Sequence, residues 1–175
     1  MSGTSPAPDQ DEVDRIVAAW QRERPDLDPA PLQVLSRVTR LAFHLDRARR
    51  EAYAGSGLEI WEFDVLAALR RAGDPHELSP SSLAVATLVT SGTMTNRIDR
   101  LAERDLVERH PDPGDRRGVL VRLTGAGAAR VDAALADLLV RERAVLSVLP
   151  PAEAEGLVES LRALLAPFEG GPANG

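Results

Sequence analysis

The chain has 175 residues and a net charge of −6, with 43% hydrophobic residues but only 3% aromatic ones. This length fits one globular domain with peripheral helices, and its core must be built from Leu, Val and Ala. The absence of cysteine excludes disulfides, thiolate metal sites and thiol-based redox sensing. Because no apolar run approaches a membrane span and the N-terminus lacks a signal-peptide pattern, we expect a soluble, cytoplasmic protein.

The acidic net charge argues against nonspecific coating of DNA, but the charge is unevenly distributed. Residues 91–124 hold seven arginines and six acidic residues, a net charge of +1, whereas the remainder carries −7. Basic charge is therefore modestly concentrated in one segment, as in proteins that bind nucleic acid through one surface.

The N-terminal part of the chain predicts three helices. Residues 1–10 are expected to be disordered. Helices are predicted over Asp11–Glu23, Leu32–Ala54 and Glu59–Ala72, separated by prolines and glycines. The positions expected to face inward in the first two helices are Val13, Ile16, Val17 and Trp20, and Leu35, Val38, Leu41, Ala42, Leu45 and Ala48.

The segment from Ser79 to Thr124 carries the most informative motif. A short helix, capped by Ser81-Ser82, is followed by a second helix that opens at Thr90-Ser91-Gly92. Two β-type runs, 106–109 and 119–123, then flank the loop HPDPGDRRG. Helix, turn, helix and hairpin predict a winged helix-turn-helix, whose second helix lies in the DNA major groove. The apolar positions of the two helices are Leu83, Ala84, Ala86 and Leu88, then Met94, Ile98, Leu101 and Ala102.

The outer face of the second helix carries side chains that suit contacts with base edges. Threonine, asparagine and arginine supply the donors and acceptors that read bases, whereas a merely solvated face, the alternative, would more often carry Lys–Glu pairs. The candidate DNA contacts on this helix are Ser91, Thr93, Thr95, Asn96 and Arg100.

The hairpin loop predicts a basic wing. Pro111, Pro113 and Gly114 favour a turn. Arg116 and Arg117 are placed at its tip, where flat guanidinium groups suit a narrow minor groove. Asp115 is interpreted as the partner that orients one of these arginines.

The runs SGTMTNRIDRLAERDLVER and DPGDRRGVLVRLT resemble the recognition helix and wing of the MarR family of bacterial transcription regulators. The resemblance covers about Leu32 to Leu165. It implies a mainly α fold with a small β-hairpin wing and with N- and C-terminal dimerisation helices. It also implies a homodimeric repressor that binds a pseudo-palindromic operator, with its recognition helices in major grooves about 10 base pairs apart.

The expected domain organisation follows from this resemblance and from the helix pattern. The divisions are 1–10, a disordered tail; 11–54, the N-terminal and dimerisation helices; 55–124, the DNA-binding domain; 125–169, C-terminal dimerisation helices; and 170–175, a second tail. Thr124 is predicted to cap a helix that runs to about Val148, and Pro151 to begin the last helix. The apolar faces of these helices exceed what a small winged domain covers, so a partner subunit is expected to cover them.

Asp64 is the acidic residue with the most apolar neighbours at helical spacing. Such a carboxylate needs a basic partner or a ligand, with a structural salt bridge or an exposed edge as the alternative. Arg97 lies on the flank of the second helix, and Arg109 at the end of the first wing strand. Trp20, Asp64, Arg97 and Arg109 together resemble a urate-responsive subset of the family, which implies urate or a related purine as ligand. A phenolic carboxylate is the alternative ligand class.

Other functions find less support in the sequence. There are no paired catalytic carboxylates, nucleophile motif or phosphate loop, so no enzyme and no cofactor are expected. His44, His76 and His110 lack metal-ligand spacing. His44 is interpreted either as a plain interface residue or as a group that titrates near neutrality. A winged-helix protein that binds another protein and no DNA is the alternative that the acidic net charge permits.

Overall fold

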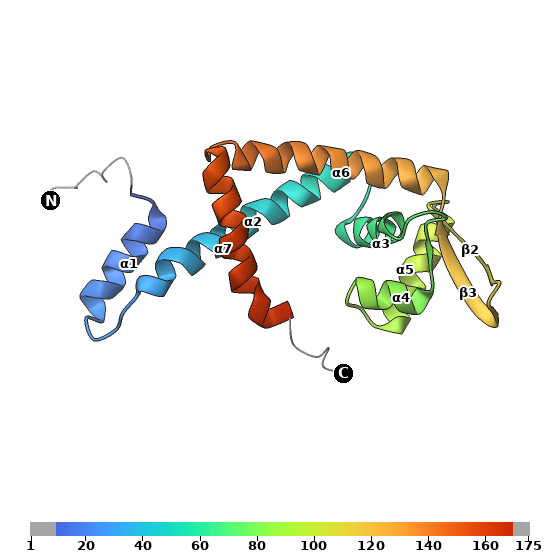
Figure 1. The fold of residues 1–175 in the computed structure, drawn as a ribbon, viewed down its shortest axis with the longest axis horizontal. Helices are drawn as coiled ribbons and strands as arrows, with labels where there is room; N and C mark the ends of the chain where they lie inside the picture. Colours follow the sequence, from blue (N-terminus) through green and yellow to red (C-terminus); the bar gives the residue numbers. More distant parts are fainter. Residues whose placement is uncertain (1–9, 170–175) are drawn as a thin grey trace. The chain divides into compact units, whose positions relative to one another are not determined.

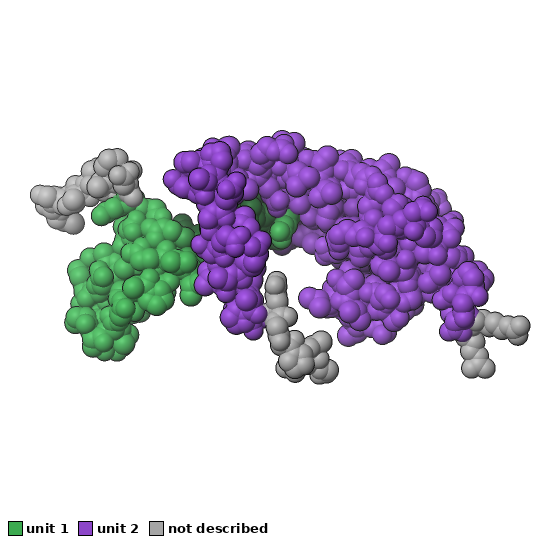
Figure 2. All heavy atoms as spheres, in the orientation of Figure 1, with its two compact units in different colours: residues 1–49 green, residues 50–175 purple. Residues whose placement is uncertain are grey.

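The computed structural model describes residues 10–169, except for the side chains of Arg116, Arg117 and Glu169. It divides into two compact units, residues 1–49 and 50–175 (Figure 2). The described residues form seven helices and one three-stranded sheet (Figure 1). The predicted fold class, mainly α with a small β wing, is confirmed.

The first unit contains α1 (Glu12–Glu23) and most of α2 (Ala30–Gly55). Asp11 caps α1, since its Oδ1 accepts a hydrogen bond from the Asp14 amide at 3.0 Å. Arg37 on α2 binds both acids, with Nε 2.8 Å from Asp11 Oδ2 and Nη2 2.9 Å from Asp14 Oδ1. This network holds the start of α1 against α2, and α2 itself begins earlier than predicted because Pro31 is tolerated in a first turn.

The apolar faces of the first unit are only partly buried. Val13 and Val17 are buried as predicted, but Trp20 is 51% exposed. On α2, Leu35 and Val38 are likewise exposed. The prediction that these residues all face inward is therefore wrong for a single chain, because periodicity gives the apolar face of a helix and not what covers it.

The second unit has one core shared by α3 (Ile60–Arg71), α4 (Pro80–Ala86), α5 (Ser91–Glu103) and α6 (Gly125–Leu146). The predicted stripe of α5 is confirmed at three positions, with Ala102 partly buried at the edge of the core. The buried side chains of α5 and α6 are Met94, Ile98, Leu101, Val131, Ala134 and Leu138. Half of α6 thus packs within the winged unit.

The helix starts follow capping residues. Thr90 caps α5 and Thr124 caps α6, as predicted. The cap of α4 is Ser79 rather than Ser81-Ser82: Ser79 Oγ accepts from the Ser82 amide at 3.1 Å. Leu88, one of the apolar positions of the predicted short helix, lies outside α4 and is 93% exposed, since α4 ends at Ala86 and Leu88 follows with φ +54°.

The sheet has the order β1-β3-β2, and both pairings are antiparallel. Its strands are β1 (Glu77–Leu78), β2 (Val107–Asp112) and β3 (Asp115–Leu123). β1 was not predicted, because two residues are too few to show periodicity. β2 and β3 extend into the predicted loop and leave only Pro113-Gly114 at the turn, where the Gly114 amide donates to Asp112 Oδ1 at 2.8 Å.

The last helix, α7 (Pro151–Glu169), begins at the predicted proline. Between Pro151 and Phe168 every residue is exposed except the partly buried Ala154. No helix within residues 10–169 has the length and apolar character needed to cross a membrane.

Candidate nucleic-acid interface and ligand site

The five predicted DNA contacts on α5 are all exposed: Ser91, Thr93, Thr95, Asn96 and Arg100. They come from the N-terminal and middle turns of a helix whose apolar side is fixed in the core. Figure 1 shows α5 with α4 on one side and the β2–β3 hairpin on the other. These side chains line two separate hollows on the two flanks of the helix.

The first hollow, of about 420 Å³, lies between α4, α5 and the wing. Ser91 and Thr95 line it together with Ser79 and Ser81, so hydroxyl groups gather beside the start of α5. The partial positive charge of a helix N-terminus and hydroxyl donors both favour a phosphate. Ser79 and Ser81 were missed as candidate contacts; their Ser-Pro-Ser sequence, a helix-start signal, could have indicated them. The wing contributes Asp112, Asp115, Gly118 and Val119 to the lining.

The second hollow, of about 490 Å³, lies on the other flank of α5 and contains Trp61 from α3. The Arg97 guanidinium carbon lies 5.5 Å from the centroid of the Trp61 ring, and that of Arg100 lies 4.7 Å from it. Both distances are typical of cation–π contacts. The hollow therefore offers an aromatic face and two cations to a flat anion. Thr93 and Asn96 also line it.

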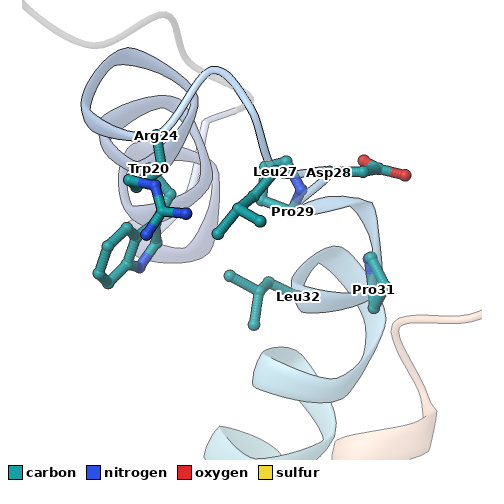
Figure 3. Close-up of a pocket in the computed structure, with 7 residues that line it drawn as sticks. All are labelled: Trp20, Arg24, Leu27, Asp28, Pro29, Pro31 and Leu32. Atoms are coloured by element: carbon teal, nitrogen blue, oxygen red, sulfur yellow. The ribbon is translucent and has the colours of Figure 1, made fainter.

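The predicted ligand residue Trp20 lies in the first unit. It lines a pocket of about 400 Å³ between the end of α1 and the start of α2. Figure 3 shows its ring and the Arg24 side chain near Leu27 and Leu32, with the Asp28 carboxylate pointing away. Arg24 is bound by Asp26 through two contacts of 2.7 and 2.6 Å between guanidinium nitrogens and carboxylate oxygens.

The other three predicted ligand residues lie apart in the second unit. Asp64 lines a hollow of about 250 Å³ with Arg71 and Thr87. Arg97 lies over Trp61. Arg109 on β2 forms an ion pair with Asp99 on α5, with Nη1 2.6 Å from Oδ1. Of the four hollows lined by Trp20, by Arg97, by Ser91 and by Asp64 within the described residues, each contains at most one of the predicted four.

Glu62, rather than Asp64, is the acid buried among apolar side chains. Asp64 is exposed, which was the alternative interpretation, whereas Glu62 is 1% exposed. Glu62 forms an ion pair with Arg104, the C-cap of α5. The neighbours Ala67 and Ala68 are buried in the core as the spacing suggested, but Asp64 itself lies on the exposed edge of α3.

A charged cluster joins the three strands of the sheet. Arg122 on β3 donates to Glu77 Oε2 on β1 from Nε at 3.0 Å and from Nη2 at 2.8 Å. His110 on β2 places Nε2 2.8 Å from the same oxygen. The Arg122 guanidinium lowers the pKa of Glu77 below its usual value of 4.5. The carboxylate is therefore held charged between two basic side chains.

For the two wing arginines, the structure describes the backbone but not the side chains. Arg116 and Arg117 belong to β3, and their side chains lie outside the described part of the chain. They sit two and three residues after the turn at Pro113-Gly114, in the strand rather than in a loop.

Known transcription regulators resemble this chain in sequence, one of them over nearly its full length. The MarR family model matches residues 56–118. The HTH-type transcriptional regulator PecS of Dickeya dadantii is 39% identical over 158 residues, which cover 90% of this chain and 93% of PecS. The chain belongs to the MarR family. It is a DNA-binding transcription regulator and not an enzyme, as the resemblance implied.

Solved structures of MarR-family proteins share the fold. A mutant Escherichia coli MarR complexed with operator DNA is 28% identical, with a TM-score of 0.62, over 78% of this chain and 96% of that chain. Bordetella bronchiseptica BpsR, whose DNA binding is regulated by 6-hydroxynicotinic acid, is 30% identical with a TM-score of 0.60, over 75% of this chain and 91% of that chain. The shared fold is a winged helix, in which β2–β3 forms the wing hairpin beside α5.

Proposed function

We propose that this MarR-family regulator is a homodimeric repressor that binds a pseudo-palindromic operator and releases it when a small flat anion binds. The observation that carries the regulatory part is the PecS resemblance over nine-tenths of the chain. Operator contacts are assigned to the exposed side of α5 and to the wing. The residues are Ser91, Thr93, Thr95, Asn96, Arg100, Arg116 and Arg117.

The homodimer is supported by the exposed apolar side chains of α6 and α7. A helix of 19 residues whose described side chains are all exposed except Ala154 has no core of its own to stabilise it. Apolar patches of this kind mark protein interfaces, and a second copy of the chain carries the matching patches. The residues are Leu135, Leu139, Val140, Leu157, Leu161, Leu164, Leu165 and Phe168.

The ligand proposal rests on Arg97 and its aromatic neighbour Trp61. A flat anion would stack on an aromatic face and accept charge-assisted hydrogen bonds from guanidinium groups. Urate or a related purine fits this chemistry. A hydroxylated aromatic carboxylate is the second ligand class, favoured by the regulation of BpsR by 6-hydroxynicotinic acid. Asp64, Arg109 and Trp20 are proposed to contribute in the dimer.

Operator release under added ligand tests this proposal. A fluorescent duplex, selected from a random library by the protein itself, would be titrated with urate, xanthine or salicylate. We expect one class to release it and to raise the unfolding temperature of the free protein, since a ligand shifts an equilibrium only by its differential affinity. Failure of every compound to do either would refute the flat-anion proposal.

Two variants test whether Arg97 and Asp64 take part in the response to the ligand. Arg97→Ala should weaken ligand binding more than operator binding, and Asp64→Asn should blunt release while leaving operator affinity in place. Arg15→Ala is the matched control, because Arg15 is an exposed arginine of α1 that pairs only locally with Glu12. If Arg97→Ala abolished operator binding and left ligand affinity unchanged, Arg97 would be a DNA contact instead.

A further inference from the structure

The carboxylate of Glu62 is the one charged side chain classed as buried among the described residues. Its Oε2 accepts a hydrogen bond from the Glu59 amide at 2.9 Å, which closes the first turn of α3. Its Oε1 accepts from Arg104 Nη1. A buried carboxylate without its cationic partner is strongly destabilising, so Arg104 is required at this position.

Arg104 links three parts of the fold. It is the C-cap of the recognition helix α5, and its Nη2 donates to the Gly57 carbonyl at 2.7 Å. Gly57 lies in the short connection between Gly55, the last residue of α2, and the start of α3. The end of the recognition helix is therefore attached both to α3 and to the residues that follow α2.

A second contact lies one helical turn away. Arg100 precedes Arg104 by four residues, so both side chains leave the same face of α5. Arg100 Nη2 lies 3.4 Å from Glu59 Oε1, and Trp61 Nε1 donates to Glu59 Oε2 at 2.6 Å. The two contacts connect α5 to the start of α3 at two points about one helical turn apart on α5. Of the two, only the Glu62–Arg104 pair is buried on its acidic side.

We propose that Glu62 and Arg104 are positioning residues for operator recognition: they contact no DNA, and they set the orientation of each recognition helix relative to α3 and the residues that follow α2. A buried ion pair contributes little net stability compared with apolar side chains of similar volume, whereas its geometry is specific. The pair therefore serves to hold α5 in one pose. The proposal rests on the proposed homodimer, in which two such helices must match two half-sites.

The test measures how sharply the protein discriminates half-site spacing. Dissociation constants would be compared for the selected operator and for the same duplex with one base pair inserted at its centre. We expect the wild type to lose about tenfold or more on insertion, as a rigid dimer must. Glu62→Gln should weaken binding to the selected operator about tenfold. It should also bring the ratio of the dissociation constants for the two duplexes toward one. The salt dependence of binding should stay unchanged, because the same phosphates are contacted.

A double variant protects the test against unfolding. E62M/R104M removes both charges and keeps the volume, so it leaves no unpaired buried charge. It should fold, dimerise and show the same loss of spacing discrimination. Arg70→Met is the matched control, since Arg70 also joins α3 to a neighbour, through Asp132 on α6, and not to α5. Its spacing ratio should equal that of the wild type.

The outcomes separate this proposal from the function on which it rests. A wild-type protein that is indifferent to spacing would overturn the homodimer, and the positioning role with it. A spacing-sensitive wild type with equally sensitive, folded Glu62→Gln and E62M/R104M proteins would overturn the positioning role alone.

Discussion

The recognition helix and wing contain seven arginines, and several of these guanidinium groups have partners inside the protein. Arg97 lies over Trp61, Arg104 holds the buried Glu62, and Arg109 pairs with Asp99. Each of these contacts orients a cation that would otherwise sample many rotamers. The residue type alone, read from sequence, does not distinguish an arginine that contacts DNA from one that contacts another side chain of the protein.

The wing arginines are predicted to contact DNA. Changing Arg116 and Arg117 together to alanine should lower operator affinity at least tenfold, since each charge-assisted DNA contact contributes about 1–3 kcal/mol. Fluorescence anisotropy at moderate salt measures this. Arg15→Ala combined with Arg22→Ala, which removes two charges from α1, should have little effect. Equal affinities of the wing variant and the wild type would remove the wing from the DNA interface.

Among the elements, α6 contacts the β2–β3 hairpin through its first turn. A Cβ at Gly127 would lie 2.1 Å from the Leu106 carbonyl oxygen and 2.8 Å from Leu123 Cδ1, so this turn approaches the backbone at the start of the hairpin directly. Only glycine permits such an approach. Because Val131, Ala134 and Leu138 follow on the same helix and are buried, this contact fixes where α6 enters the core.

Gly127→Ala should therefore destabilise the protein, by more than the roughly 1–3 kcal/mol typical of an overpacked core site, because the atom it meets is backbone. Gly125→Ala is the matched control: it lies in the same turn with no atom within 4 Å of its added Cβ. That change should be neutral or slightly stabilising, since alanine favours helix. Urea unfolding measures both, and equal midpoints would contradict the close approach.

The sheet should show a specific sensitivity to acid. Because Arg122 lowers the folded-state pKa of Glu77, this carboxylate stabilises the fold above its usual pKa of 4.5, and the contribution is lost as pH falls through the lower, folded value. Between about pH 7 and pH 3.5 the unfolding temperature of Glu77→Gln should therefore fall less than that of the wild type. Glu155→Gln, on the exposed α7, should follow the wild type. Parallel curves for wild type and Glu77→Gln would contradict the role of the Glu77–Arg122 pair.

At the scale of the whole molecule, the exposed apolar side chains of α6 and α7 are the feature that a single chain leaves unexplained. Phe168 is 84% exposed, and Leu164 and Leu165 beside it are about half exposed. Burying such side chains contributes about 25 cal/mol per Å² of apolar surface removed from water, which favours a stable partner. The proposed homodimer supplies that partner and the two-fold symmetry that a palindromic operator requires.

Light scattering at micromolar concentration should accordingly give twice the chain mass of 18.8 kDa. Leu161→Glu combined with Leu165→Glu, which places charges in the apolar face of α7, should shift the protein toward monomer and weaken operator binding with it. The matched change of Glu155 and Glu159 to Gln, on the same helix, should leave the mass at the dimer value. A wild-type monomer at this concentration would contradict the proposed symmetry.

The sequence by itself determined the elements and the family. A local pattern is enough to find a buried stripe, which depends on helical period, and a helix cap, which depends on neighbouring residues. The stripe was Met94, Ile98 and Leu101, and the caps were Thr90 and Thr124. The motif after Ser91 was specific enough to indicate the MarR family. The two-residue strand β1 carried no such pattern, because it forms by pairing with β3, a strand far away in the sequence.

The tertiary structure decided which side chains meet. Glu62 and Arg104 are 42 residues apart, and Trp61 meets Arg97 and Arg100 only because α3 packs beside α5. The same packing left Asp64 exposed and placed Arg109 against Asp99. Spacing along a helix fixes the direction of a side chain within about one turn. Its partner across the core depends on how several helices close around one another, which no local pattern contains.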